Sequence, residues 1–496
     1  MESFWNAERK NYKKFDSISN DINASVCVIG GGLSGLSTAY YLSKNLSVAL
    51  VERDVICGST SGNTTGKITS QHGLFYDYLI NSQSKEYAKK YLEANEKAIN
   101  NIEQIIKKEQ IDCDFEREKA YVFTQKETEV YKIENEQKAV EKIAKGKSKL
   151  TKQIELPVEI QGAIEFENQA QFHPVKYAYG LANCIIKNGG KIFENSQAKN
   201  IKKQNGKYVV YVNDNKIIAD FVVIATRYPF ISIPGYYFLK MYQSTSYAIV
   251  ADVKKELFKG MYINLEVPNI SFRTIKDGDK TLLLAVGFDY KTGTEELRDG
   301  YARLETMVRK MYPDAEILYK WSAEDCITLD KIPYIGEFSK MMPNVYIATG
   351  FNKWGITSSN IAANIITDKI LGKENEYAEI FESTRMEPIK NRQEVGDMLK
   401  EANKSILLSR FKVPKAKLDD IKIGEGKIIE IEHVKVGAYK SNDGEIYKIK
   451  PVCTHLGCEL YFNNIDKTWE CPCHGSKFTY DGKSIEVPSN KNLDTF

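Results

Sequence analysis

The chain reads ASVCVIGGGLSGLSTAYYLSKNLSVALVE from residue 24 to residue 52. A short apolar run rich in β-branched residues at 26–29 predicts a buried strand. Apolar residues then recur at helical spacing up to Leu42, and a second strand is predicted at 47–51, directly before Glu52. This order of strand, glycine-rich turn, helix and strand predicts the first unit of an α/β nucleotide-binding domain.

The glycines after the first strand are spaced as G-x-G-x-x-G, at Gly30, Gly32 and Gly35. The first permits a tight turn, the second lets the backbone approach a pyrophosphate, and the third lets the helix pack closely on the sheet. The free N–H groups at the start of the helix attract phosphate. Glu52 lies where a carboxylate can hydrogen-bond a ribose, which favours FAD or NAD over NADP. A glycine-rich turn without a ligand is the alternative.

Composition restricts the remaining possibilities. The 496 residues are enough for two to four domains, and 42% hydrophobic with 27% charged residues is typical of globular proteins. The 69 basic and 66 acidic residues nearly balance, which argues against nucleic-acid binding. Residues 1–15 lack the apolar segment of a signal peptide, and the chain has no 18-residue apolar run, so we expect a cytoplasmic protein.

Four further stretches follow the first unit in a characteristic order. They are the polar loop GSTSGNTTGKITSQHG at 58–73 and the segments at 172–201, 221–229 and, within 329–371, LDKIPYIGEF and NVYIATGFNKWGITSSNIAANIITDKIL. Over roughly residues 20–375 the sequence thereby resembles FAD-dependent oxidoreductases of the D-amino-acid oxidase, glycine oxidase and sarcosine oxidase type. The resemblance favours FAD over NAD, and it implies a Rossmann-like FAD-binding domain with an α+β substrate domain.

The resemblance divides residues 1–375 between these two domains. FAD-binding parts are expected at about 20–80, 150–235 and 320–375, and substrate-domain parts at about 81–149 and 236–319. Together with the glycine motif, it implies FAD contacts from the following residues: Gly30, Gly32, Leu33, Ser34, Gly35, Glu52, Arg53, Thr60, Thr64, Thr65, Gly66, Lys67, Ala225, Thr226, Gly350, Phe351, Gly355, Ile356 and Thr357. A helix starting near Thr357 would direct its N-terminus at the flavin pyrimidine, where negative charge develops on reduction.

Candidate catalytic residues are His72 and Lys353, each of which is also compatible with a structural role. Many relatives of this type have a histidine after the glycine at position 350, whereas this chain has Phe351, so their catalytic details are not carried over. Cys326 lies just before Asp330, closer than the linking cysteine of the sarcosine oxidase pattern. We therefore expect a non-covalent FAD.

The C-terminal stretch CTHLGCELYFNNIDKTWECPCHGSKF, residues 453–478, contains four of the nine cysteines and two of the five histidines. Two cysteines and two histidines could hold zinc, but zinc modules usually separate paired ligands by two to four residues, and only one residue separates Cys453 from His455. A Rieske [2Fe–2S] centre also takes two cysteines and two histidines.

The loops CTHLGC at 453–458 and CPCHGS at 471–476 resemble the two cluster-binding loops of Rieske proteins of the cytochrome bc type. The resemblance implies that Cys453 and Cys471 bind one iron, that His455 and His474 bind the other, and that Cys458 and Cys473 form a disulfide. It also implies hydrogen-bond donors to the cluster sulfurs at Gly475 and Ser476, and Tyr480 is a further candidate donor.

Alternating residues around an Asn-Asp-Gly turn, within 424–447, indicate short antiparallel strands. The predicted C-terminal module is therefore an all-β Rieske domain over 412–496, joined by a helical linker at 376–411 to the flavin region.

These features together predict an FAD-dependent dehydrogenase. We expect it to oxidise an amine or amino acid and to pass electrons through the Rieske cluster to an external acceptor. There are two alternatives. One is an electron-transfer component, that is, a flavin/Rieske reductase that feeds or drains another redox protein. The other is a redox sensor. A second complete G-x-G-x-x-G for a nicotinamide nucleotide is absent from the sequence. The sequence is compatible with electron flow from FAD to the cluster and with flow from the cluster to FAD.

Overall fold

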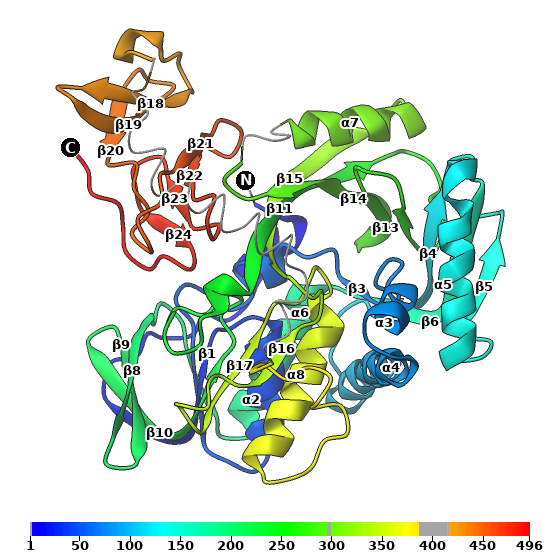
Figure 1. Cartoon of the computed structure of the whole chain (residues 1–496), viewed down its shortest axis with the longest axis horizontal. Coiled ribbons are helices and arrows are strands. Elements are labelled where there is room, and N and C mark those ends of the chain that lie inside the picture. The colour runs from blue at the N-terminus through cyan, green and yellow to red at the C-terminus, as the bar shows by residue number, and fades with distance from the viewer. Residues whose placement is uncertain (1, 295–298, 386–413, 415) are drawn as a thin grey trace.

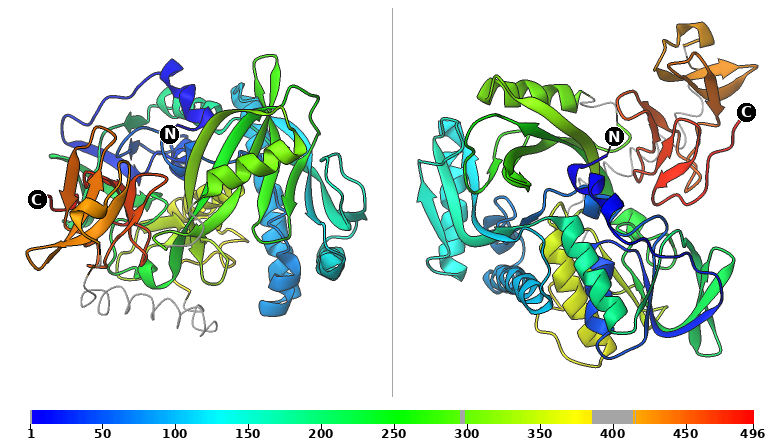
Figure 2. Two further views of the ribbon diagram at one scale, coloured as in Figure 1. Left: turned by 90° about the horizontal axis from the view of Figure 1, so that it is seen from above. Right: turned by 180° about the vertical axis from the view of Figure 1, so that it is seen from behind.

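The computed structural model describes residues 2–294, 299–385, 414 and 416–496 (Figure 1). These residues form two large sheets with their helices and a smaller C-terminal module. In Figures 1 and 2 the C-terminal strands lie beside the other two parts, and the red strands β21–β24 face them while the orange strands β18–β20 lie further out.

The first sheet has the order β16-β17-β10-β1-β2-β7, and β8 and β9 extend from β10. Its strands are β1 (Ile22–Ile29), β2 (Val48–Val51), β7 (Lys191–Phe193), β8 (Ala198–Gln204), β9 (Lys207–Val212), β10 (Asn215–Ile224), β16 (Tyr334–Glu337) and β17 (Val345–Thr349). The strands from β17 to β7 are parallel. The predicted strands at 26–29 and 47–51 therefore form the neighbours β1 and β2, as expected of an α/β domain.

Helices α2 (Leu33–Leu42), α6 (Pro174–Lys187) and α8 (Gly355–Ile370) pack together against the first sheet. The turn from β1 into α2 is tight because Gly30 has φ +109°, a conformation that other residues rarely adopt. A Cβ at position 35 would lie 1.9 Å from the Gly30 carbonyl oxygen. The third glycine of the motif thus allows the helix to contact the preceding turn, as predicted.

The second sheet is nine-stranded, with the order β15-β11-β14-β13-β12-β4-β6-β3 and β5 paired to β6. Its strands are β3 (Lys67–Ile68), β4 (Glu116–Thr124), β5 (Ser148–Thr151), β6 (Gly162–Gln171), β11 (Met241–Asp252), β12 (Met261–Asn264), β13 (Ile270–Asp277), β14 (Lys280–Lys291) and β15 (Glu316–Thr328). The antiparallel pairing expected between residues 240 and 310 is present in β11 and β14.

The division between the two domains differs from our expectation. We assigned residues 150–235 and 320–375 to the FAD-binding part, but β6 and β15 belong to the second sheet. β15 pairs along its whole length with β11, whose residues lie some 75 positions earlier in the chain. Side-chain periodicity identifies a strand but not a distant partner, so it could not place these strands.

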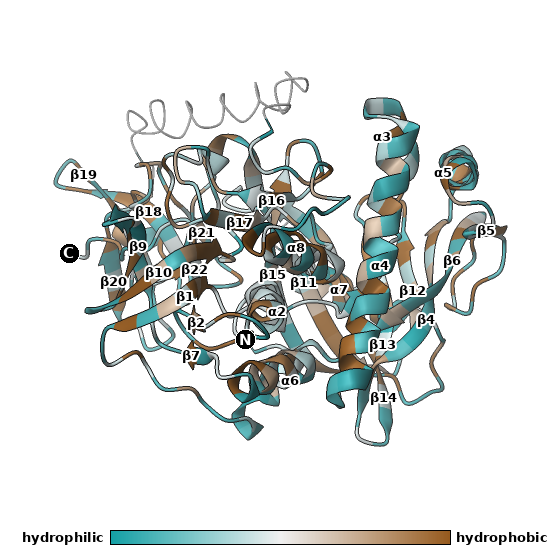
Figure 3. Ribbon diagram, turned by 90° about the horizontal axis from the view of Figure 1, so that it is seen from below, coloured by the Kyte–Doolittle hydropathy of each residue, from teal (hydrophilic) through white to brown (hydrophobic). Residues whose placement is uncertain are grey.

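The remaining helices surround the second sheet and the domain junction: α1 (Phe4–Ala7), α3 (Tyr76–Ser82), α4 (Lys85–Glu109), α5 (Val130–Ile143) and α7 (Gly300–Met311). α4 is largely hydrophilic in Figure 3, and most of the apolar residues of α4 and α5 are buried. None of the helices in the described ranges is both long and apolar enough to cross a membrane.

The C-terminal module consists of two small antiparallel sheets. One contains β18 (Gly426–Ile431), β19 (Val434–Lys440) and β20 (Ile446–Ile449), and the other contains β21 (Tyr461–Asn463), β22 (Thr468–Glu470), β23 (Lys477–Thr479) and β24 (Ser484–Glu486). The all-β prediction is confirmed. In the predicted helical linker, residues 376–385 form turns, and residues 386–411 lie outside the described residues.

The contact between Gly35 and the preceding turn leads to a first prediction. Substituting Gly35→Val should force α2 away from β1, lower the flavin content of the purified protein and destabilise the flavin region by about 3 kcal/mol, the upper range for overpacking. Urea unfolding followed by tryptophan fluorescence would measure the change. Gly162→Ala is the matched control, because its new Cβ would make only ordinary contacts at 3.7 Å. Equal stability of the two variants would contradict the prediction.

Candidate functional site

A cavity of about 540 Å³ opens at the carboxyl ends of β1 and β10, between the two large sheets. This is where open α/β sheets bind nucleotides. Of the predicted FAD contacts, these residues line it: Gly30, Gly32, Leu33, Ser34, Glu52, Arg53, Thr60, Thr64, Ala225, Thr226, Gly350, Phe351, Gly355 and Ile356. The structure thus brings three segments, distant in the sequence, to one cavity.

The start of α2 has the properties of a phosphate site. Gly32 is the residue before the helix, and the buried Ser34 hydroxyl has no hydrogen-bond partner in the described part of the chain. Glu52 accepts hydrogen bonds from the Gly31 and Asp54 N–H groups, at 2.7 and 2.9 Å. Burial raises the pKa of Glu52. A carboxylate has about four acceptor positions, so Glu52 can still bind hydroxyl groups. These residues fit a dinucleotide.

Five predicted FAD contacts, namely Gly35, Thr65, Gly66, Lys67 and Thr357, are not among the residues lining the cavity. Lys67 lies on β3, and its ammonium donates to the Tyr262 carbonyl at 2.9 Å and to Ser271 Oγ at 2.5 Å. The structure therefore directs this side chain into the second sheet instead of toward phosphate. Burial lowers its pKa well below the usual value.

His72 does not reach the cavity either. Its Nε2 donates to the Thr69 carbonyl and its Nδ1 accepts from the Tyr91 hydroxyl, both at 2.8 Å. The ring stacks on Trp354 with 4.6 Å between centroids. Burial lowers the pKa of His72 to about 3, so the imidazole is neutral. Both nitrogens are occupied, and the residue stabilises the fold.

Lys353, in contrast, lines the cavity at the end covered by the second sheet. Its ammonium lies 3.0 Å from an Asp289 carboxylate oxygen on β14 and 3.3 Å from Ser246 Oγ on β11. Asp325 on β15 also lines the cavity; burial raises its pKa, and the nearby Lys353 counteracts this. Asp289 and Asp325 lie on strands without a sequence motif, so the sequence did not indicate them.

The backbone around Lys353 is unusual. Asn352 and Lys353 both adopt left-handed conformations, with φ of +52° and +71°. Asn352 holds this conformation because its side chain accepts from the Thr328 N–H at 2.8 Å and donates to the Gly350 carbonyl at 2.9 Å. Consecutive left-handed residues other than glycine cost free energy and occur preferentially at functional sites.

The second site lies in the C-terminal module. Cys453 and Cys471 are buried free thiols, and a disulfide joins Cys458 to Cys473. The rings of His455 and His474 lie 5.0 Å apart, and in both the Nδ1 atom is buried without a hydrogen-bond partner in the described residues. Two thiols and two unpaired imidazole nitrogens form a donor set for metal ions, and it fits a Rieske cluster.

Hydrogen-bond donors surround the two free thiols. A hydrogen bond from Cys471, the N–H groups of His455 and Leu456 and the Ser476 hydroxyl lower the pKa of Cys453 to about 7. Ser476 is fully buried, as its predicted role requires. Tyr480, the other candidate donor, instead packs between Tyr439 and Tyr447 at 4.9 Å from each ring centroid.

A family model of FAD-dependent oxidoreductases, DAO, matches residues 25–369. The chain belongs to this family. A second family model, the Rieske [2Fe–2S] domain, matches residues 411–496. Both cofactor predictions, FAD for the flavin region and a [2Fe–2S] cluster for the C-terminal domain, agree with these families.

Individual proteins match either nearly the whole chain or about three quarters of it. The chain is 35% identical over 495 residues to the putative Rieske 2Fe-2S iron-sulfur protein YhfW of Bacillus subtilis (strain 168), covering 99% of this chain and 97% of that protein. It is 22% identical to gamma-glutamylputrescine oxidoreductase of Escherichia coli (strain K12), over 75% of this chain and 89% of that one. The structure of glycine oxidase from Geobacillus kaustophilus has the fold of the flavin region, with a TM-score of 0.61, 18% identity and coverage of 73% and 99%.

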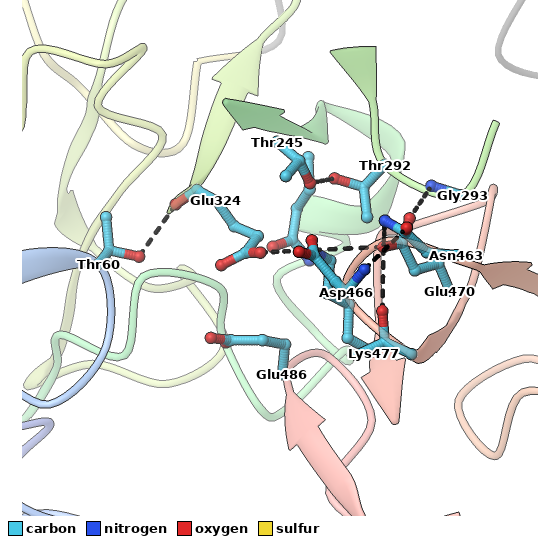
Figure 4. A network of polar contacts seen from close by, with 12 residues as sticks. Thr60, Thr245, Thr292, Gly293, Glu324, Asn463, Asp466, Glu470, Lys477 and Glu486 are labelled. Atoms are coloured by element: carbon cyan, nitrogen blue, oxygen red, sulfur yellow. Dashed lines mark hydrogen bonds and ion pairs between the residues drawn. The ribbon is translucent and has the colours of Figure 1, made fainter. Parts of the chain in front are cut away.

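Buried charges join the Rieske domain to the oxidoreductase region (Figure 4). Lys477 on β23 lies 2.5 Å from Glu324 on β15 and 3.4 Å from Glu470 on β22. Arg227, which follows β10, lies 3.7 Å from Glu324 and 2.5 Å from Glu486 on β24. Burial opposes the charge of Glu324, but Lys477 and Arg227 lower its pKa. The five side chains form a line of alternating charge across the interface.

The histidine edge of the Rieske domain faces the oxidoreductase region. Ser232 Oγ lies 3.0 Å from His455 Nε2, and the Phe238 ring lies 5.8 Å from that of His474. The buried Gln243 side chain donates to the His474 carbonyl at 2.6 Å. Gln243 pairs in the sheet with Cys326, which lines the flavin cavity. One pair of neighbouring residues, Gln243 and Cys326, therefore links the second cluster loop to the cavity.

The line of charges leads to a second prediction. Lys477→Met should leave Glu324 and Glu470 buried without their common cation and weaken domain docking by about 3–5 kcal/mol. Urea unfolding and limited proteolysis would show the Rieske domain separating at lower denaturant. Lys483→Met is the control, because Lys483 is 72% exposed and pairs with the partly exposed Asp481 of the same turn. Unchanged docking in Lys477→Met would contradict the assignment.

A third prediction concerns the cluster. The purified protein should contain about two iron atoms and two acid-labile sulfides for each chain, as a [2Fe–2S] centre requires. Cys453→Ser should lose both, whereas Cys184→Ser, which changes a buried thiol on α6, should retain both. Metal analysis that finds zinc in place of iron and sulfide would contradict the assignment.

Proposed function

We propose that this chain is a dehydrogenase that oxidises an amino acid or amine at a carbon–nitrogen bond and delivers the electrons to an external one-electron acceptor. The observation that carries the proposal is that two residues of opposite charge, Lys353 and Asp325, line the cavity, and that Asp289 outside the lining pairs with Lys353. A cation and a carboxylate that line the same cavity can bind the two oppositely charged groups of an amino acid. When bound, FAD supplies a two-electron acceptor, and the Rieske cluster supplies a one-electron carrier.

The residues have separate roles in this proposal. Lys353 binds a substrate carboxylate, Asp325 orients the amino group, and Asp289 holds Lys353 in position through their ion pair. The cavity-lining residues named above hold FAD, with the start of α2 at the diphosphate and Glu52 at the ribose. Cys453 and Cys471 bind one iron of the cluster, and His455 and His474 bind the other.

Two further observations support this choice. Gamma-glutamylputrescine oxidoreductase and glycine oxidase, to which the flavin region is similar, are both named for nitrogen compounds as substrates. The histidine edge of the Rieske domain is covered by Ser232 and Phe238 of the oxidoreductase region. An internal route for electrons between the two domains accounts for this contact, whereas a separate redox sensor would not require it.

Anaerobic mixing with a panel of amino acids and amines tests the proposal. A substrate should bleach the flavin absorption near 450 nm first and the visible bands of the cluster afterwards. Bleaching by NADH without a response to any amine would overturn it and would favour a flavin/Rieske reductase.

A fourth prediction tests the role of Lys353 with the substrates that this panel identifies. Lys353→Met should raise KM for amino acids by about 10- to 100-fold, the range expected for losing a charged hydrogen bond. For the corresponding amines without a carboxylate, KM should change by less than about 3-fold. Lys340→Met, at an exposed position, is the control. Equal effects on both substrate classes would show that Lys353 does not bind the carboxylate.

A further inference from the structure

The flavin cavity has a wall that belongs to the Rieske domain. Ser484, Ile485, Glu486, Val487 and Asn490 line the cavity together with the residues of the oxidoreductase region. These five residues lie on β24 and directly after it, some 120 positions beyond the end of α8. The sequence motifs for FAD end before residue 375, so nothing in them indicates that the C-terminal domain reaches the cofactor site.

Three contacts attach this wall to the nucleotide-binding loops. Arg227 Nη2 pairs with Glu486 Oε2 at 2.5 Å, and Ser59 Oγ donates to Glu486 Oε1 at 3.0 Å. Arg53 Nη2 donates to the Ile485 carbonyl at 2.8 Å. The wall is therefore held to Arg53, next to the ribose-binding position Glu52, and to the polar loop that follows it.

Glu486 is the centre of this attachment. Its side chain and that of Arg227 are only 15% and 14% exposed, so the pair is shielded from water. Both carboxylate oxygens are engaged by groups of the oxidoreductase region, one by Arg227 and the other by Ser59. The Glu486 carboxylate is therefore bound by protein groups, and it neutralises Arg227, which also lines the cavity.

We propose that residues 484–490 of the Rieske domain are part of the FAD-binding site, and that Glu486 latches them over the cavity. FAD then enters or leaves only when this segment separates from the oxidoreductase region. A chain with a docked Rieske domain retains FAD, and loss of docking releases it. The inference requires FAD in the cavity but does not depend on the substrate, so it stands or falls separately from the proposed amine oxidation.

The test is the rate of FAD release from the full-length holoprotein. Glu486→Gln keeps the shape of the side chain and removes its charge. After dilution, the recovery of free-flavin fluorescence should be about 10-fold faster than in the unmodified protein, because a shielded charged pair is lost. The visible and EPR spectra of the cluster should stay unchanged, which shows that the Rieske domain is folded. Glu445→Gln, at an exposed Rieske residue that contacts Tyr447, is the matched control and should not alter the rate.

A second variant keeps the test decisive if the Glu486 variant does not fold. Ser59→Ala removes the hydrogen bond from Ser59 Oγ to Glu486 and should accelerate FAD release by about 2- to 5-fold. Unchanged release in both variants would overturn the proposal. Slower release in Glu486→Gln would also overturn it, since it would show that the carboxylate repels the cofactor diphosphate instead of closing the cavity. If Glu486→Gln fails to assemble the cluster, the rate in Ser59→Ala decides.

Discussion

A line of alternating buried charges holds the Rieske domain against the flavin region. Glu470, Lys477 and Glu486 come from one side, and Glu324 and Arg227 from the other. Removing such ions from water costs several kcal/mol each, and only mutual pairing offsets this cost. Sliding one domain across the other would leave a buried charge without its counter-ion. The network is therefore compatible with one docked arrangement, on which the cavity wall and the orientation of the histidine edge both depend.

Close packing reinforces this arrangement at the second cluster loop. A Cβ at Gly293 would lie 2.4 Å from the Cys471 carbonyl carbon, and one at Gly475 would lie 2.5 Å from Gln243. The backbones of the two domains thus approach each other more closely than larger residues would allow. In consequence the cluster loop contacts Gln243 on β11, whose neighbour in the sheet, Cys326 on β15, lines the flavin cavity. The folded chain thereby brings the flavin cavity and the cluster loop close to each other.

Prediction from sequence succeeded where the chemistry is local. The strand, turn and helix from β1 to β2, the antiparallel strands of the second sheet and the all-β C-terminal domain were all expected. It failed where long-range pairing decides: β6 and β15 joined the second sheet, and Lys67 and His72 point away from the cavity. Within the polar loop at 58–73, spacing alone could not say which side chains turn toward the cofactor and which turn into the second sheet.

Short fixed spacings, such as Gly30 to Gly35 and Cys453 to His455, were sufficient to predict a dinucleotide site and a metal site, and the resemblance to known families then indicated FAD and a [2Fe–2S] cluster. Their mutual placement was decided only by the folded chain. Glu324 and Lys477 are separated by 153 positions, and Arg227 and Glu486 by 259. No local pattern encodes such pairs, since their energy depends on burial and on the absence of competing water, and both arise only when the domains pack together.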